Sequence, residues 1–184
     1  MSKYIILDRD GVINHDSAEF VKNIDEFIIY PNSLQAIANL TQNNYKIIIC
    51  TNQSGIGRGL FSVADLNEMH NKLIQEVRDS GGNIEAIVFC PHTTEDNCNC
   101  RKPKPGMILD ICERLNLDIT QTMMVGDSIR DLQAIKSAGG IPVLVKTGNG
   151  KKTFAKEQLP EGTLVFNDLL EVSIYLINHT DKDN

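Results

Sequence analysis

The sequence has no excess of positive charge and no long hydrophobic stretch. Its 184 residues include 18 Lys and Arg against 24 Asp and Glu, a formal net charge of −6, and its pI is near 5.2. Nucleic-acid binding generally needs a basic face that meets the phosphate backbone, so this composition argues against it. An anionic ligand would have to meet a local group of cations or a bound metal ion.

The hydrophobic runs are too short for a membrane span or a secretory signal. Only four apolar residues, Tyr4–Leu7, precede Asp8, whereas the core of a signal peptide has roughly 7–15. The longest run, Ala86–Cys90, is far shorter than the roughly 20 residues of a transmembrane helix. We therefore expect a cytoplasmic protein without membrane contact. In that compartment cysteines stay reduced, and clustered cysteines favour metal binding over disulfides.

The chain also lacks internal repeats and low-complexity linkers. Its length suits one substantial core. The composition, 41% hydrophobic and 23% charged residues, is typical of a soluble globular protein. We predict a monomer with one domain over residues 1–184 and a frayed tail from about residue 179.

Short apolar runs alternate with helical patterns along the chain. The predicted strands are Tyr4–Leu7, Lys46–Cys50, Ile84–Cys90, Thr122–Val125, Ile141–Val145 and Thr163–Phe166. The longer predicted helices begin at Pro31, Ser62, about Ile108, Ser128 and Asp168, and the last ends near Asn178. Such alternation indicates a mainly parallel sheet covered on both faces, a Rossmann-like three-layer α/β/α sandwich. No large cap domain is expected, because only Asn14–Tyr30 and a cysteine-rich loop are sizeable insertions.

Polar clusters follow four of the predicted strands. They are Asp8–Asn14, Thr51–Gly59, Cys90–Lys104 and Gly126–Asp131. In open parallel sheets, ligands bind beyond the carboxyl ends of the strands. The four clusters should therefore converge on one edge of the sheet and form the functional site.

The stretch LDRDGVIN places two carboxylates at the end of a strand. Asp8 and Asp10 would lie on one side, about 6–7 Å apart along the chain, and Gly11 lets the chain turn beyond them. Two such carboxylates repel each other unless a cation lies between them. Magnesium suits this position, since it accepts carboxylates and completes its shell with water and phosphate oxygens. A lone D-x-D pair is also common in solvated acidic turns.

The segment VGDSIRD favours the magnesium site over the acidic turn. Asp127 follows a strand and can supply a further magnesium ligand. Asp131 lies one helical turn beyond it, and this spacing leaves two roles open: a surface helix carboxylate, or a group that orients its neighbours. After the second strand, Thr51 offers a hydroxyl, and the backbone N–H groups that follow can cradle phosphoryl oxygens. The G-K-[ST] ending of a Walker A loop is missing.

Four potential metal ligands lie within eleven residues: Cys90, His92, Cys98 and Cys100. Three thiolates and an imidazole suit closed tetrahedral zinc, and a closed site leaves no position for catalysis. The zinc of this loop, residues 90–100, should therefore be structural. The loop leads into Arg101 and Lys102, two cations that an acidic protein needs beside a phosphorylated ligand. Unrelated thiols in a loop are the other interpretation.

In this order the four clusters resemble the haloacid dehalogenase-like phosphohydrolases. That family has D-x-D after the first strand, Thr or Ser after the second, then a Lys and an acidic motif. The resemblance implies that Asp8 is the nucleophile and forms an aspartyl-phosphate, and that Asp10 is the general acid and base. It also implies that Thr51 and Lys102 stabilise the phosphoryl group. Magnesium would be held by Asp8, Asp127 and the backbone carbonyl of Asp10.

A narrower resemblance covers Tyr4–Gly148. LDRDGVIN, TNQSGIGRG, CPH…CNCRKPKPGM and MMVGDSIRDLQAI together resemble the D-glycero-D-manno-heptose 1,7-bisphosphate 7-phosphatase family of ADP-heptose and lipopolysaccharide synthesis. This resemblance implies a small phosphorylated sugar as substrate and zinc in the cysteine-rich loop. The implied substrate contacts are Asp16, Ser17, Ala18, Glu19, Thr51, Asn52, Gln53, Ser54, Arg58, Arg101 and Lys102.

Two alternatives remain open at the level of the sequence. Histidinol-phosphate phosphatases, of histidine biosynthesis, share the D-x-D motif and the zinc loop, and the short spacer Thr93–Asn97 is like theirs. GVIN and SGIGRG with Arg58 favour the heptose family, because these residues lie beside the substrate whereas loops tolerate changes in length. A non-catalytic zinc protein that binds a phospho-sugar is disfavoured, because every catalytic residue type is present. The sequence does not distinguish the α and β anomers.

Overall fold

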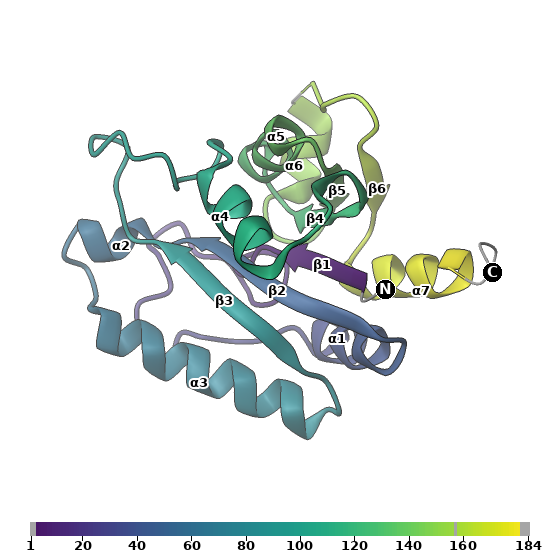
Figure 1. Ribbon diagram of the computed structural model, residues 1–184. Coiled ribbons are helices and arrows are strands. Elements are labelled where there is room, and N and C mark those ends of the chain that lie inside the picture. The colour runs from purple at the N-terminus through teal and green to yellow at the C-terminus, as the bar shows by residue number, and fades with distance from the viewer. Residues whose placement is uncertain (1–2, 157, 181–184) are drawn as a thin grey trace.

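The computed structural model describes residues 3–156 and 158–180 (Figure 1). Its elements, in chain order, are β1 (Lys3–Leu7), α1 (Pro31–Gln42), β2 (Tyr45–Asn52), α2 (Ser54–Gly57), α3 (Val63–Asp79), β3 (Ile84–Cys90), α4 (Gly106–Leu115), the 3-10 helix η1 (Ile119–Gln121), β4 (Met123–Gly126), α5 (Ile129–Ala138), β5 (Ile141–Val145), α6 (Gly150–Lys156), β6 (Leu164–Phe166) and α7 (Leu169–Thr180). The last helix thus extends two residues beyond its predicted end. The rest of the predicted tail, residues 181–184, lies outside the described residues.

All six strands form one parallel sheet in the order β3-β2-β1-β4-β5-β6. This arrangement confirms the predicted parallel sheet. The strands begin and end close to their predicted bounds, and β2 is the longest because it continues through Thr51 and Asn52. These two residues, predicted to follow the strand, are therefore held by the sheet itself.

Strand side chains alternate between two hydrophobic cores. Ile5 and Ile47 pack with residues of α1, α3 and α7, whereas Ile6 and Ile48 pack with residues of α4 and α5. Figure 1 shows α1 and α3 on one side of the sheet and α4 and α5 on the other. Because both faces are covered, each strand reads as a continuous apolar run. The three-layer α/β/α architecture is confirmed.

Helix α3 begins where the sequence predicted it, directly after Ser62. The Ser62 hydroxyl accepts from the Asp65 backbone N–H at 3.2 Å, and the Asp65 carboxylate accepts from the Ser62 N–H at 2.7 Å. This reciprocal capping box fixes the start of α3. The elements α2, η1 and α6 were not predicted, since segments of seven residues or fewer show no helical period. None of the helices in the described ranges has the length and apolarity to cross a bilayer.

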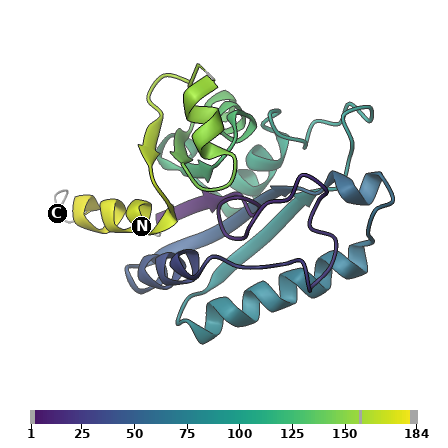
Figure 2. The same cartoon turned by 180° about the vertical axis from the view of Figure 1, so that it is seen from behind.

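The segment between β1 and α1 runs past α3, as the dark purple trace of Figure 2 shows. Val12 and Phe27 of this segment are fully buried. The Lys72 ammonium of α3 donates to the carbonyl of Phe27 at 3.0 Å. The segment is therefore packed onto the main core, and it forms no cap domain within the described chain.

The carboxyl ends of four adjacent strands meet at one edge of the sheet, as the clusters predicted. Asp8 follows β1 and its backbone N–H donates to Val125 of β4 at 2.9 Å; the Gln53 N–H, after β2, donates to Cys90 at the end of β3 at 2.7 Å. These bonds fix the loops relative to one another. Side chains from distant parts of the sequence are thereby brought to one place.

Candidate active site

A cavity of about 180 Å³ opens at this edge. Its lining residues come from the end of β2, from the segments that follow β1, β2, β4 and β5, from the start of α5, and from the two residues after the cysteine-rich loop. They are Asp8, Asp10, Asp16, Ser17, Phe20, Val21, Asn52, Gln53, Ser54, Arg101, Lys102, Asp127, Ser128, Arg130, Asp131 and Asn149. The polar groups therefore converge on a single site.

Three carboxylates gather at the floor of the cavity. Asp8, Asp127 and Asp131 each place an oxygen within 4.8 Å of the other two, and all three are buried. Carboxylate oxygens at this spacing can bind one magnesium ion, which prefers oxygen ligands. Asp131 is only 1% exposed, so it is not a surface helix carboxylate.

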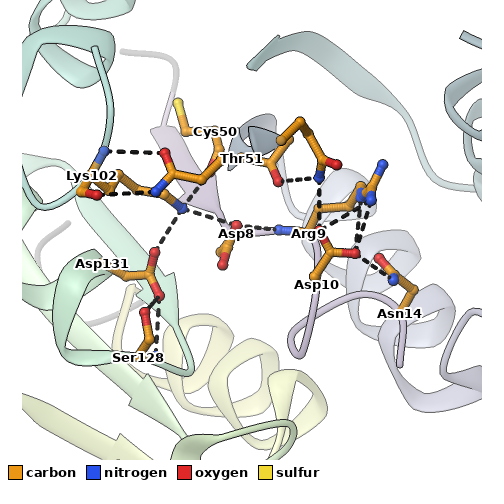
Figure 3. Close-up of polar contacts among 11 residues, drawn as sticks. Asp8, Arg9, Asp10, Asn14, Cys50, Thr51, Lys102, Ser128 and Asp131 are labelled. Atoms are coloured by element: carbon orange, nitrogen blue, oxygen red, sulfur yellow. Dashed lines mark hydrogen bonds and ion pairs between the residues drawn. The ribbon is translucent and has the colours of Figure 1, made fainter. Parts of the chain in front are cut away.

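Lys102 neutralises part of this negative charge. Its ammonium lies 2.9 Å from Asp8 and 2.6 Å from Asp131 and donates to the Cys50 carbonyl at 2.8 Å (Figure 3). Three acceptors satisfy the three protons of the ammonium. Burial by itself would lower the pKa of Lys102, but Asp131 and Asp8 raise it, and the group stays charged. A phosphoryl group at Asp8 would meet a cation held in place.

The main chain of Lys102 is fixed by Asn52 at the end of β2. The Lys102 N–H donates to the Asn52 side-chain oxygen at 3.1 Å, and the Asn52 amide donates to the Lys102 carbonyl at 3.0 Å. The other oxygen of Asp131 accepts from the N–H of Ser128 at 3.1 Å and from its hydroxyl at 2.6 Å. Asp131 thus orients Lys102 and caps α5 at once.

Asp127 is enclosed by backbone. Its carboxylate accepts from the Asn149 N–H at 2.7 Å. Gly11, with φ +83°, and Gly148, with φ +51°, approach the same carboxylate so closely that a Cβ on either would overlap it. The Asn149 amide also donates to Asp16 at 2.7 Å. The loop after β5 therefore braces Asp127 and ties it to the rim of the cavity.

Asp10 points to a different set of partners. Its carboxylate accepts from Arg9, Asn14 and Gln53, whereas the carboxylate of Asp8 lies with those of Asp127 and Asp131. The guanidinium of Arg9 draws the Asp10 side chain to itself. Ligation of magnesium through the Asp10 backbone carbonyl stays a prediction.

The carboxylate cluster predicts a pH dependence of stability without magnesium. Burial, followed by the charge of Asp131, raises the pKa of Asp8 from 3.8 to about 7, and the same two causes with Asp8 raise the pKa of Asp127 to about 8. Between about pH 4 and 8 the folded state then binds more protons than the unfolded state. The free energy of unfolding should fall as the pH rises through this window and level off above it.

Urea unfolding of zinc-loaded, magnesium-free protein across this pH range measures the effect. Asp127→Asn removes one of the two titrating groups and should give a shallower slope. Added magnesium competes with protons for the same oxygens, so it should stabilise the protein more at the alkaline end than at the acid end. A profile that does not change with pH would contradict the expectation.

The cysteine-rich loop brings its four ligands together. All four lie within 4.8 Å of one another; Cys90 Sγ is 3.2 Å from Cys100 Sγ and 3.7 Å from Cys98 Sγ, and His92 Nδ1 is 3.3 Å from Cys100 Sγ. A tetrahedral zinc with bonds of about 2.3 Å spaces its sulfur ligands by about 3.8 Å. The donor set and spacing fit zinc, and each described cysteine is free of disulfides.

The predicted substrate contacts divide into two groups. Those that line the cavity are Asp16, Ser17, Asn52, Gln53, Ser54, Arg101 and Lys102. Those that do not are Ala18, Glu19, Thr51 and Arg58. Thr51 is buried directly behind the lining, where its hydroxyl accepts from Gln53 at 2.9 Å, and the roles predicted for the second group stay predictions.

Several cavity residues were not predicted. Ser128 and Arg130 lie at the start of α5, inside the VGDSIRD motif, and their places next to Asp127 and Asp131 could have marked them. Asn149 lies in the polar turn Thr147–Gly150 after β5, at the same edge as the four predicted clusters. That fifth cluster is the signal that would have found it. Arg9, which does not line the cavity but contacts Asp8 and Asp10, gave no signal, because it stands between two recognised aspartates.

The chain matches one protein family and close relatives of stated activity. Residues 5–139 match the haloacid dehalogenase-like hydrolases. Over 177 residues the chain is 56% identical to D-glycero-beta-D-manno-heptose-1,7-bisphosphate 7-phosphatase of Neisseria meningitidis serogroup A, and the match covers 95% of each.

Two crystal structures are also similar. D,D-heptose 1,7-bisphosphate phosphatase from B. bronchiseptica, complexed with magnesium and phosphate, has a TM-score of 0.94 and 53% identity, over 96% of this chain and 98% of that chain. The D,D-heptose 1,7-bisphosphate phosphatase from Burkholderia thailandensis has a TM-score of 0.77 and 43% identity, over 95% and 98% of the two chains. The chain is thus similar in sequence and fold to phosphatases of one substrate class.

Proposed function

The chain belongs to the haloacid dehalogenase-like hydrolases, and within that family we propose that it removes the C7 phosphate of D-glycero-D-manno-heptose 1,7-bisphosphate. One observation carries the chemistry: Asp8 faces the cavity beside Asp127 and Asp131, with Lys102 2.9 Å from its carboxylate. A nucleophile, a metal-binding group and a cation therefore meet where a phosphoryl group would lie.

The reaction has two steps at Asp8. In the first, an Asp8 oxygen forms a bond to phosphorus while the bond from phosphorus to the sugar oxygen breaks, and Asp10 gives that oxygen a proton. In the second, a water oxygen forms a bond to phosphorus while the bond from phosphorus to the Asp8 oxygen breaks, and Asp10 takes a proton from the water; phosphate leaves and Asp8 is a carboxylate again. Asp10 ends in its starting state. Thr51 and Lys102 stabilise the charge on the phosphoryl oxygens in both steps.

Two metals have separate tasks in this proposal. Asp8, Asp127 and the Asp10 carbonyl would hold magnesium, which supplies positive charge to the transferring phosphoryl group. The four ligands of the cysteine-rich loop would hold zinc, which fixes the loop without taking part in the reaction. The mixed sulfur and imidazole set supports this assignment, because magnesium prefers oxygen.

Two arginines of the cavity support a small phosphorylated sugar as substrate. Arg101 and Arg130 both line the cavity; burial first, and then the charge of Arg130, lower the pKa of Arg101. Two arginines that repel each other suit a second phosphate group, and the relatives act on a bisphosphate. We propose that the protein works as a single-domain cytoplasmic monomer that serves ADP-heptose synthesis for lipopolysaccharide.

A phosphate-release panel tests the proposed function. The relatives' names specify the β anomer, which the sequence left open, so the zinc-loaded protein with magnesium should act best on β-heptose 1,7-bisphosphate. We expect its kcat/KM to exceed that for the α anomer and that for histidinol phosphate by at least about tenfold, a common size of pocket discrimination. Phosphorus NMR of the product should show the C1 phosphate still present.

The panel also decides between the alternatives. Preference for histidinol phosphate would assign the protein to histidine biosynthesis instead. Tight binding of the bisphosphate with no phosphate release would assign it to the non-catalytic zinc proteins. Either result would overturn the proposed function.

A further inference from the structure

Arg9 is a fully buried arginine between two catalytic aspartates. Its exposed fraction is 0%, and it does not line the cavity. A guanidinium is always charged, so burial to this extent requires partners on every side. Its backbone already serves the site: the Arg9 N–H donates to Asp8 at 2.8 Å. The side chain turns to the second aspartate.

The guanidinium holds the carboxylate of Asp10 through both of its oxygens. Arg9 Nη2 lies 2.9 Å from Asp10 Oδ1 and 3.1 Å from Oδ2, and Nε lies 3.3 Å from Oδ1. Figure 3 shows this pair and Asn14, which donates to Oδ1 at 2.9 Å. Gln53 donates to Oδ2 at 2.8 Å. Oδ2 accepts two of these bonds and Oδ1 accepts three, so Oδ2 has more room for a further partner.

The orientation of Asn14 follows from the same arrangement. Its amide nitrogen donates to Asp10 and to the His15 carbonyl at 2.8 Å. In the described part of the chain, Asn14 Oδ1 is the buried side-chain polar atom left without a hydrogen-bond partner. Such an atom is costly and calls for a reason. Here the reason is that the amide must point its hydrogens toward Asp10.

Helix α3 and the β1–α1 segment support Arg9 from behind. His70 Nε2 of α3 lies 3.3 Å from Arg9 Nη1, and the Phe27 ring lies 5.1 Å from the guanidinium carbon. A guanidinium has only donors, so Nε2 must accept and the His70 proton is on Nδ1. Burial, and then Arg9, lower the pKa of His70 to about 4. His70 is therefore a neutral acceptor, and the edge of Phe89 packs against its ring.

We propose that Arg9 is a positioning residue for the reaction, and that His70 in turn positions Arg9. The pair holds the Asp10 carboxylate toward the cavity, so that one oxygen can pass a proton to the departing sugar oxygen. This inference rests on the proposed phosphatase function. A purely structural role for Arg9, in which it only neutralises buried charge, would lower stability and affect all substrates alike.

The leaving group separates these two roles. A sugar alkoxide leaves poorly and needs the proton from Asp10, whereas p-nitrophenolate leaves without one. The ratio kcat/KM covers only the steps up to cleavage of the first phosphorus–oxygen bond, so the later use of Asp10 as a base does not enter. Misplacement of Asp10 should therefore lower kcat/KM for a sugar phosphate far more than for p-nitrophenyl phosphate.

The experiment compares Arg9→Gln, Arg9→Lys and His70→Phe with the unaltered protein, with zinc and magnesium present. For Arg9→Gln we expect kcat/KM to fall about 50-fold on β-heptose 1,7-bisphosphate and less than about threefold on p-nitrophenyl phosphate. The loss is partial, because general acid–base catalysis contributes roughly 100- to 10,000-fold in full and Asp10 is misplaced rather than removed. Arg9→Lys keeps the charge without the forked geometry and should recover part of the loss. Leu73→Ala is the matched control, since Leu73 is as fully buried as Arg9 and lies on α3, like His70.

Each outcome has one meaning. Leu73→Ala should lower stability and leave the ratio of the kcat/KM values for the two substrates unchanged. Equal losses on both substrates for Arg9→Gln, or no loss, would overturn the positioning role. If Arg9 variants do not fold, His70→Phe decides: a smaller loss confined to the sugar phosphate supports the inference, and any other result overturns it. Absence of phosphate release by the unaltered protein would instead overturn the proposed function.

Discussion

Asp8→Asn is expected to reduce phosphate release at least about 1000-fold, because an amide oxygen cannot form the aspartyl-phosphate. The substitution keeps the shape of the side chain and removes one negative charge beside Asp127 and Asp131. Without magnesium, the variant should therefore be as stable as the original protein at neutral pH, or more stable. Steady-state phosphate release and urea unfolding measure the two effects.

The pairing of lost activity with retained stability distinguishes a nucleophile from a structural carboxylate. Asp110→Asn provides the control, since Asp110 is an exposed helix residue that pairs with Arg114 at 2.9 Å. It should leave activity unchanged. If Asp8→Asn released phosphate at a rate near that of the original protein, Asp8 would not be the nucleophile, and the two-step reaction would fail.

Cys98→Ser is expected to release zinc, lower stability and weaken substrate binding. Lys102 is the one buried residue of the segment between β3 and α4, so the segment has little core of its own and a metal is the main source of its order. We expect the free energy of unfolding to fall by about 4 kcal/mol, the stabilisation that a ligand gives at roughly 1000 times its Kd. The KM should rise about tenfold, because Arg101 directly follows the last ligand.

Metal analysis, urea unfolding and steady-state kinetics measure these three effects. Magnesium affinity should stay unchanged, because Asp8 and Asp127 lie on other loops. Cys112→Ser is the matched control: this cysteine of α4 packs in the core and is not part of the four-ligand cluster. The control should retain zinc. Unchanged stability and metal content in Cys98→Ser would reduce the cluster to a chance grouping of thiols.

The site could largely be predicted because it sits where strands end. Asp8, Thr51, Cys90 and Asp127 each stand at the end of an apolar run, and parallel pairing places such ends at one edge. Lys102 lies in the polar cluster after β3, and its role was predicted from the resemblance to the haloacid dehalogenase-like phosphohydrolases. What the sequence cannot encode locally is the direction in which a side chain turns. Thr51 thus lies behind the cavity lining rather than on it.

Arg9 and Asp131 show most clearly what could not be predicted from the sequence. Arg9 looks like a spacer in LDRDGVIN, and its acceptor His70 lies 61 residues away on a helix whose apolar stripe suggests ordinary packing. Only the tertiary fold brings the two together. For Asp131, helical spacing left a surface position and an orienting role equally open, and its burial against Lys102 decided between them. For both residues, contacts between distant elements rather than sequence motifs revealed the role.

The two ion pairs of Lys102 also make the carboxylate cluster sensitive to the valence of the ion it binds. Once a bound ion displaces the protons of Asp8 and Asp127, three ionised carboxylates and one ammonium leave two negative charges on the cluster. A divalent ion cancels them, and uncancelled charge is costly in a buried site. A monovalent ion would leave a negative floor that repels phosphate, and a trivalent ion would leave a positive one that retains it after hydrolysis. We therefore expect Lys102 to favour the binding of doubly charged ions at the cluster.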